Sequence, residues 1–235
     1  MISKNIENVK QQVARAAFLS GKSLQDIQIV YVTKYAKIED VIELIRLGYY
    51  SIGENRLQEI NRKKNILNDV FAKEVMDKIQ WHFIGHLQSN KARQVADFAY
   101  LVQSVDSFKI ADKLNKAALD NKKKIDILIQ VNIASEDAKS GISFSQTEDF
   151  FKNIAVFREL NIKGIMAIGP YYDDPEDSRP GFKAAKACFD KVNGFLTRNA
   201  YPEMEILSMG MSHDYVVAIE EGANMVRIGS AVFGG

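Results

Sequence analysis

The hydrophobic positions of the chain fall into short runs of β-forming residues that alternate with longer stretches of helical period. Eight such runs are predicted as strands, at 27–33, 50–53, 79–85, 100–104, 125–132, 162–168, 205–208 and 224–228. Several of them are nearly continuous apolar runs, such as Ile-Asp-Ile-Leu-Ile-Gln-Val from position 125. Runs of this kind are typical of strands that are covered on both faces.

Amphipathic stretches separate the strands. Seven helices are predicted, at 38–47, 56–67, 91–98, 108–121, 147–160, 181–198 and 212–221. In the fourth, Ile110, Leu114, Ala117 and Ala118 recur at the spacing of one buried face. Strict alternation of strand and helix predicts a parallel sheet, and eight repeats predict that the sheet closes into a (β/α)8 TIM barrel.

A further amphipathic segment, 2–19, precedes the first strand. Its predicted buried face consists of Ile6, Val9, Val13, Ala16 and Ala17. Because the chain stops soon after the eighth strand, we expect this N-terminal helix to complete the outer ring in place of an eighth C-terminal helix. No Gly/Ser/Pro-rich linker interrupts the pattern, so residues 1–235 are predicted to form a single domain. The one long irregular stretch, 169–181, is predicted as a loop after the sixth strand.

Composition and charge narrow the class of partner. The chain has 31 Lys and Arg against 30 Asp and Glu, a near balance that disfavours nucleic acid or an acidic membrane as partner. No apolar run approaches the ~18 residues of a membrane span, and the first residues do not resemble a signal peptide. The single cysteine, Cys188, cannot form an intrachain disulfide, so we expect a cytoplasmic protein. Cys188, Met166, Met209 and Met211 are expected in the core.

In a parallel barrel the active site lies at the C-terminal ends of the strands, so the residues there are candidates. Lys34 directly follows the first strand, where apolar walls would lower its pKa and suit it to Schiff-base chemistry. Lys37 lies three residues further along and is an alternative candidate for the Schiff-base lysine. Lys34 could also be a surface lysine that begins a loop. His82 and His86 lie four residues apart with no third ligand nearby, so no metal site is predicted.

Serine and glycine residues follow the last two strands. Ser212 is predicted at a helix start, and Gly229 and Ser230 follow the eighth strand. Backbone N–H groups at such positions favour a phosphate, and TIM barrels often place a phosphate site there. An ordinary helix cap and a tight turn would produce the same pattern. Arg227 ends a buried strand, where its charge requires a partner, and a structural ion pair is one candidate.

A Schiff-base lysine, a phosphate cradle and a buried arginine together point to pyridoxal 5'-phosphate (PLP). The motifs in this chain are Val32-Thr-Lys34, Ile52-Gly-Glu-Asn-Arg-Leu-Gln-Glu59, His82-Phe-Ile-Gly-His-Leu-Gln-Ser-Asn-Lys91, Lys139-Ser-Gly-Ile142, Leu207-Ser-Met-Gly-Met-Ser212 and Met225-Val-Arg-Ile-Gly-Ser-Ala-Val-Phe-Gly234. These motifs occur in order along almost the whole chain. In them the chain resembles the pyridoxal phosphate homeostasis proteins, which are relatives of the N-terminal barrel of bacterial alanine racemases.

The resemblance implies roles for individual residues. Lys34 matches the lysine that holds the cofactor as a Schiff base, and Asn55 matches the asparagine beside the ring. The phosphate cradle is matched by Met211, Ser212, Gly229 and Ser230. Arg227 matches the arginine that faces the pyridine nitrogen. Because arginine stays protonated, it would leave the ring a poor electron sink and disfavour strong carbanion chemistry.

The resemblance implies a monomeric binding protein of intracellular PLP homeostasis, rather than an enzyme, that could deliver the cofactor to PLP-dependent apoenzymes. Related racemases take a second base from a tyrosine in an additional domain, and the sequence shows no evident acid or base opposite Lys34. An amino-acid racemase or related proton-transfer enzyme is the alternative function, and a barrel that acts on sugar phosphates without PLP is a third. Lys139, near the predicted barrel mouth, is a candidate for a secondary landing site of the cofactor.

Overall fold

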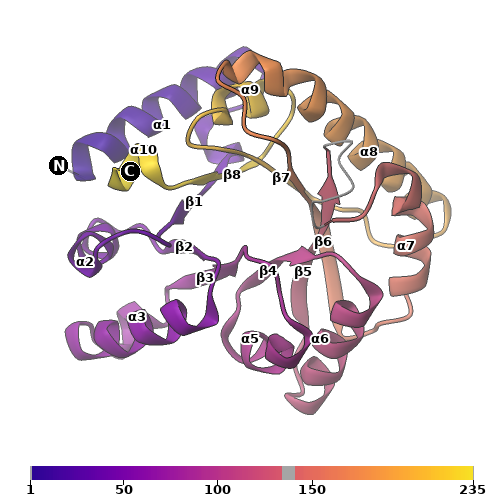
Figure 1. Ribbon diagram of the computed structural model, residues 1–235, viewed down its shortest axis with the longest axis horizontal. Helices are drawn as coiled ribbons and strands as arrows, with labels where there is room; N and C mark the ends of the chain where they lie inside the picture. The colour runs from indigo at the N-terminus through magenta and orange to yellow at the C-terminus, as the bar shows by residue number, and fades with distance from the viewer. Residues whose placement is uncertain (1, 134–140, 235) are drawn as a thin grey trace.

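Eight parallel strands form a closed barrel in the computed structural model, which describes residues 2–133 and 141–234 (Figure 1). The strands are β1 (Gln28–Val32), β2 (Ser51–Glu54), β3 (Gln80–Phe83), β4 (Leu101–Val105), β5 (Ile125–Asn132), β6 (Leu160–Ile168), β7 (Ile206–Met211) and β8 (Met225–Ile228). Each strand pairs with the next in the chain, and β8 pairs with β1, so the sheet has no open edge. The predicted TIM-barrel class is therefore confirmed.

Helices surround the barrel on its outer side (Figure 1). The α-helices are α1 (Ile2–Leu19), α2 (Ile38–Arg46), α3 (Leu57–Val70), α4 (Lys73–Met76), α5 (Ala92–Phe98), α6 (Phe108–Asp120), α7 (Thr147–Ile154), α8 (Arg179–Arg198), α9 (Tyr215–Glu220) and α10 (Ser230–Phe233). Short 3-10 helices are η1 (Leu24–Asp26), η2 (Ser89–Lys91), η3 (Phe144–Gln146) and η4 (Pro175–Ser178). Within the described ranges, the helices lack the combination of length and apolar character that a membrane crossing requires.

Several predicted helix boundaries were wrong, including the end of the helix predicted over 56–67, which extends to Val70. The helix predicted over 147–160 ends at Ile154, because Leu160 already pairs with Ile125 in the sheet. The helix predicted from 212 begins at Tyr215, since the preceding residues form a turn. The loop predicted to extend to 181 is shorter, because η4 and then α8, from Arg179, follow its first residues.

The N-terminal helix completes the outer ring, as predicted. α1 contacts α2, α9 and α10 and thus lies between the first and last helices of the ring (Figure 1). Its buried residues are Ile2, Ile6, Val9, Val13, Ala16 and Ala17. The Asn5 side-chain amide donates to the Val232 carbonyl at 2.9 Å, and the Tyr215 hydroxyl donates to Gln12 Oε1 at 2.9 Å. The helix is therefore held to the C-terminal part of the barrel by both apolar burial and hydrogen bonds.

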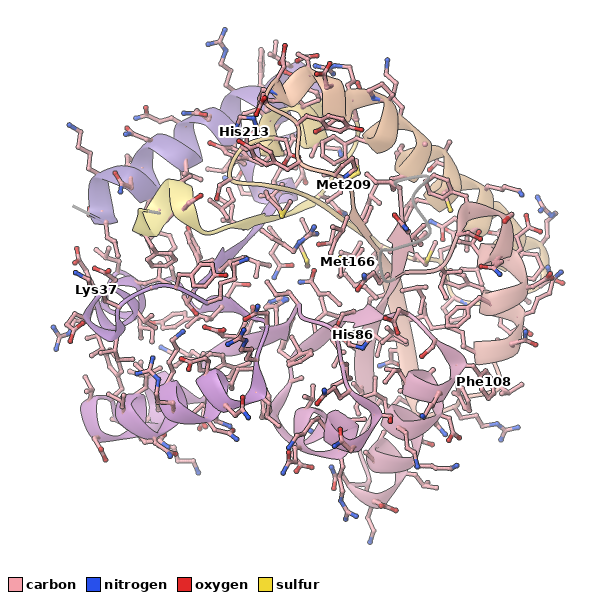
Figure 2. The ribbon with its side chains drawn as sticks, viewed as in Figure 1. Lys37, His86, Phe108, Met166, Met209 and His213 are labelled. Carbon is pink, nitrogen blue, oxygen red and sulfur yellow. The ribbon has the colours of Figure 1, made fainter. Side chains whose placement is uncertain are left out.

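Side chains fill the middle of the barrel, so it is a packed core and not a channel. The apolar central cluster consists of Val30, Leu101, Leu128, Met166 and Met225. Figure 2 shows Met166 among the side chains at the centre and Lys37 at the outer edge. A ligand site must therefore lie at one end of the barrel.

We expect Ile6→Ala to lower the free energy of unfolding by about 2–5 kcal/mol, because the change leaves a cavity between α1 and the barrel. Ile6 is 1% exposed, whereas Phe18 on the same helix is 79% exposed. Phe18→Ala is therefore the matched control and should change the free energy by less than ~0.5 kcal/mol. Urea unfolding of both variants is the measurement, and equal effects would contradict the docking of α1.

Candidate functional site

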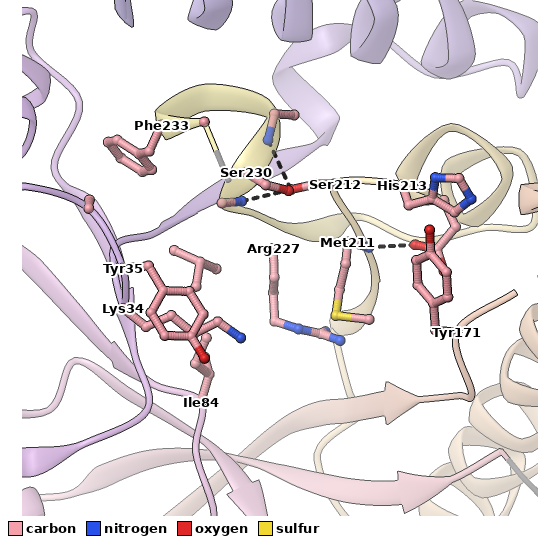
Figure 3. Close-up of a pocket in the computed structure, with 16 residues that line it drawn as sticks. Lys34, Tyr35, Ile84, Tyr171, Met211, Ser212, His213, Arg227, Ser230 and Phe233 are labelled. Atoms are coloured by element: carbon pink, nitrogen blue, oxygen red, sulfur yellow. Dashed lines mark hydrogen bonds between the residues drawn. The ribbon is translucent and has the colours of Figure 1, made fainter. Parts of the chain in front are cut away.

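A cavity of about 690 Å³ opens where β1, β7 and β8 end (Figure 3). Six residues with a predicted role at the site line it: Lys34, Met211, Ser212, Arg227, Gly229 and Ser230. Asn55, which follows β2, does not belong to the lining residues and is half-buried. The fold thus brings together the candidates from the first and the last two strands and leaves Asn55 outside the wall.

Lys34 lies at the mouth of this cavity. Its side chain is exposed, with Nζ 5.1 Å from the centroid of the Tyr35 ring. Lys34 thus lies at the barrel mouth, as expected, and Val32 and Ile84 are among the apolar residues that line the same cavity. Figure 3 shows Lys34 pointing into the cavity on the side of Arg227. Lys37 is the N-cap residue of α2 and is not among the lining residues, so of these two lysines it is Lys34 that faces the cavity.

Ser212 connects the loops that follow β7 and β8. Its Oγ accepts hydrogen bonds from the backbone N–H groups of Gly229 at 2.9 Å and Ala231 at 3.3 Å (Figure 3). Gly210, near the end of β7, has a φ of 88°, and an added Cβ there would lie 2.5 Å from Ala218 Cβ; the chain turns after Met211. Ser212 lies in this turn and not at a helix start as predicted. Because Oγ accepts both N–H groups, the Ser212 hydroxyl proton is left to donate to a ligand oxygen, as a phosphate would offer.

Met211 contributes its side chain to the cavity. Its backbone N–H donates to Asp214 Oδ1 at 2.7 Å. The side chain is 39% exposed, whereas Met166 and Met209 are fully buried. The expectation of a core position was confirmed for Met166 and Met209 and was wrong for Met211, because the turn after β7 directs it toward the mouth.

Arg227 enters the cavity floor from β8 and is 4% exposed. Its Nη1–H donates to Ser208 Oγ at 2.7 Å, and its Nη2–H donates to the Ala167 carbonyl at 3.0 Å. Both partners are neutral, and the ion pairs of the described residues do not include Arg227. Burial lowers the pKa of Arg227 to about 10, and the nearby Asp214 opposes this shift, so the guanidinium stays charged near neutral pH.

The partners of Arg227 leave part of it available to a ligand. A guanidinium has five N–H donors, and these two hydrogen bonds use two of them. A buried charge is stabilised only when its donors are matched by acceptors. Arg227 is therefore suited to bind an acceptor atom of a ligand in the cavity.

Below Arg227, a line of buried polar side chains continues into the barrel. Ser208 Oγ donates to Gln103 Oε1 at 2.8 Å. Gln103 Nε2 lies 3.1 Å from His82 Nδ1, and His82 Nε2 lies 2.9 Å from Ser51 Oγ. Burial lowers the pKa of His82 to about 3, so its imidazole is neutral. Gln103 and Ser208 were not among the predicted site residues, although a glutamine within the apolar strand Leu-Val-Gln-Ser-Val is a usable signal.

A second polar cluster lies beneath Lys34. The Glu54 carboxylate forms an ion pair with Lys63 and accepts a hydrogen bond from Thr33 Oγ1 at 2.8 Å. Lys63 Nζ also donates to the Thr33 carbonyl at 2.7 Å, and all three side chains are fully buried. Thr33 precedes Lys34, and Glu54 precedes Asn55. The cluster therefore ties together the backbones that carry both candidates, a role that the sequence analysis did not identify.

Tyr171 and His213 line the cavity on the other side of Arg227 from Lys34 (Figure 3). Their ring centroids lie 5.1 Å apart. His213 Nε2 lies 3.0 Å from the Asp173 carbonyl, which can only accept, so this nitrogen carries a proton. A phenol and an imidazole therefore line the cavity across from Lys34, where the sequence shows no evident acid or base, because the loop after β6 brings Tyr171 over the barrel end.

Cys188, His82 and His86 do not line the cavity. Cys188 is buried in α8, as predicted, and burial raises the pKa of its thiol. His82 lies inside the barrel, whereas His86 is exposed and pairs with Asp106 at 3.2 Å. Among the described residues, the His, Cys, Asp and Glu side chains form no group that could hold a metal ion. Lys139 lies outside the described residues.

Comparison with known proteins adds the family. Residues 4–235 match the family model described as alanine racemase, N-terminal domain. The chain belongs to this family. Among its relatives are two pyridoxal phosphate homeostasis proteins. That of Aquifex aeolicus is 33% identical over 231 residues, which are 98% of this chain and 96% of that protein. That of Pasteurella multocida is 35% identical over 235 residues, which are 99% of this chain and 97% of that protein.

A solved structure of the same family supports the likeness in three dimensions. PipY of Synechococcus elongatus, determined with PLP bound, is 25% identical to this chain. The two superpose with a TM-score of 0.83 over 100% of each chain. The resemblance to the pyridoxal phosphate homeostasis proteins is therefore confirmed at the level of the family.

Burial of His82 predicts a specific pH dependence of stability. An unfolded histidine binds a proton below about pH 6.5, whereas burial lowers the pKa of His82 to about 3 in the folded chain. Stability is therefore fully present above about pH 6.5 and falls by up to about 1.4 kcal/mol per pH unit as the pH drops toward 3.

We expect the His82→Gln variant to lose this component of the pH dependence. The measurement is the free energy of unfolding by denaturant at several pH values between neutral and mildly acidic. The control is His86→Gln, because the His86 side chain is 62% exposed. It should keep the slope of the unsubstituted chain, and a His82→Gln slope equal to that control would contradict the assignment.

Proposed function

We propose that this chain binds PLP in the cavity between Lys34 and Arg227 and serves PLP homeostasis. The observation that carries the proposal is that a lysine, the Ser212 hydroxyl and a buried arginine without a hydrogen-bonded carboxylate line one cavity. When bound, the cofactor supplies an aldehyde, which condenses with a primary amine to a Schiff base with loss of one water. Lys34 is the primary amine that faces the cavity.

The residues fit the other parts of the cofactor as well. Ser212 Oγ accepts hydrogen bonds from the N–H groups of Gly229 and Ala231, so its own proton is directed to other acceptors and could donate to a phosphate oxygen. An added Cβ at Gly229 would lie 3.1 Å from the Val32 carbonyl, so glycine allows this close approach. The volume of about 690 Å³ falls within the ~300–1,000 Å³ typical of small-molecule sites. Ser230, which begins α10, lines the same corner.

Arg227 is the residue that would face the pyridine nitrogen. Because it stays protonated, it donates to that nitrogen and leaves the ring a weak electron sink. This supports binding over carbanion chemistry. The names of the relatives, pyridoxal phosphate homeostasis proteins, support the same function.

The open mouth supports a carrier role. Lys34 is exposed, so a cofactor held there is accessible from solvent and could pass to a PLP-dependent apoenzyme. We propose that the chain acts as a cytoplasmic monomer for which nucleic acid and membrane are not partners. Asn55 is the proposed residue beside the ring, at the rim that the Glu54 cluster holds in place.

We expect Lys34→Ala to abolish the covalent adduct with PLP, and Lys37→Ala, the matched control, to retain it. The measurement is reduction with borohydride after incubation with PLP, followed by mass mapping of the modified peptide. An adduct mapped to Lys34 excludes a barrel that acts on sugar phosphates alone. The assignment would be wrong if Lys34→Ala kept the colour and the adduct at this cavity.

Tyr171 and His213 support a second candidate function, an amino-acid racemase or related proton-transfer enzyme, because they offer acid and base groups across from Lys34. Incubation of single-enantiomer amino acids in deuterated water separates the two candidates. For a carrier we expect solvent deuterium to enter the amino acid no faster than with free PLP. Faster incorporation that Lys34→Ala removes would establish the enzyme instead.

A further inference from the structure

Under the cavity, a chain of buried hydrogen bonds runs from Arg227 through Ser208 and Gln103 to His82. We propose that Ser208, Gln103 and His82 are positioning residues that fix the orientation of the Arg227 guanidinium and so determine how it meets the cofactor. The inference rests on the proposed function of this site. It concerns residues inside the barrel that do not line the cavity.

The direction of the first hydrogen bonds follows from Arg227 itself. A guanidinium can only donate, so Ser208 Oγ must accept from Nη1, which lies 2.7 Å away. The Ser208 hydroxyl proton is then free to point to Gln103, whose nearest atom is Oε1 at 2.8 Å. The Gln103 side-chain amide is thereby oriented with its carbonyl toward Arg227 and its NH₂ group toward the far side of the barrel.

The same logic continues to His82. The Gln103 NH₂ group can only donate, so His82 Nδ1, 3.1 Å away, must be the unprotonated nitrogen of the ring. The proton is then on Nε2, which donates to Ser51 Oγ at 2.9 Å. A second proton on His82 would set two donors against each other at Gln103. The neutral state expected from the burial of His82 is therefore also the one that the hydrogen bonds require.

This line of side chains sets the plane of the Arg227 guanidinium, which the Ala167 carbonyl alone does not set. A carboxylate that binds both Nη atoms would set the plane of a guanidinium, but Arg227 has instead one hydroxyl on β7 and one carbonyl on β6. The carbonyl belongs to the backbone and is rigid, whereas a serine hydroxyl rotates unless its own proton is engaged. Gln103 engages that proton, and its NH₂ group also contacts Met225 Sδ at 3.3 Å. Because all these partners are neutral, the positive charge of Arg227 is preserved for the ligand.

The test compares two buried serines. Ser208→Ala removes the hydroxyl that holds Arg227, and Ser104→Ala removes a buried hydroxyl that has no hydrogen-bond partner in the described structure. We expect Ser208→Ala to weaken PLP binding about tenfold and to shift the absorption maximum of the bound cofactor. Ser104→Ala should stay within about twofold of the unsubstituted chain, with an unchanged spectrum. Fluorescence titration and absorbance spectra are the measurements.

Gln103→Met provides a second variant of similar size, in case Ser208→Ala does not fold. It should produce the same shift in the spectrum, because it releases the Ser208 hydroxyl proton. The double variant Ser208→Ala/Gln103→Met should bind PLP no more weakly than Ser208→Ala alone, since both changes act through one line of contacts. Additive losses of affinity would overturn the inference.

A readout that needs no cofactor completes the test. ¹⁵N spectra of the histidines in the chain without PLP should show His82 neutral, with its proton on Nε2. A proton on Nδ1 of His82 would overturn this inference but not the proposed function. The same holds if Ser208→Ala binds PLP as tightly as the Ser104→Ala control. Failure of the unsubstituted chain to bind PLP would overturn the proposed function and the inference with it.

Discussion

Hydrogen bonding between β1 and β8 is the constraint on which the cavity depends. Residues 28–31 pair in register with residues 225–228, which closes the sheet and sets the end of the first strand beside the end of the last. Lys34 and Arg227 lie far apart in the sequence and come from opposite ends of the chain. Only closure of the barrel places both charges on one cavity.

Lys63 and Arg227, the buried cations among the described residues, are stabilised differently. Lys63 is paired with the Glu54 carboxylate and with Thr33, so its charge is balanced within the protein. Arg227 has only neutral partners in direct contact and retains unused donors. Desolvating a charge is costly unless it is paired, so the second arrangement is stable chiefly when an acceptor approaches from the cavity. The contrast distinguishes a structural cation from one suited to ligand binding.

The fold was predictable because the apolar residues of its helices and strands recur with a regular period along the sequence. The apolar face of α1 and the near-continuous apolar strands are visible in the sequence, and parallel topology then requires Lys34, Ser212 and Arg227 to meet at one end. Short polar signals were harder to interpret. The start of α9 depends on a turn closed by Asp214, and a serine before a helix looks the same whether or not it caps that helix.

Other parts of the site depend on contacts that no local pattern encodes. Gln103 and Ser208 lie 105 residues apart and meet across the barrel interior. Tyr171 reaches the cavity through the path of a loop, and the Lys63 side chain turns inward from a helix that is otherwise largely polar. These features follow from three-dimensional packing, so a single sequence offers no direct signal for them.

The hydrogen bond between Asn5 and Val232 joins positions 227 residues apart. α1 contacts η1 and α2, which follow it closely, but also α9 and α10, so its apolar face is covered completely only when these later helices are in place. Contacts of such long range slow folding, because the entropy of closing the loop must be lost before they form. During synthesis part of the apolar face of α1 therefore stays exposed until α9 and α10 have left the ribosome, and exposed apolar surface of this kind favours aggregation.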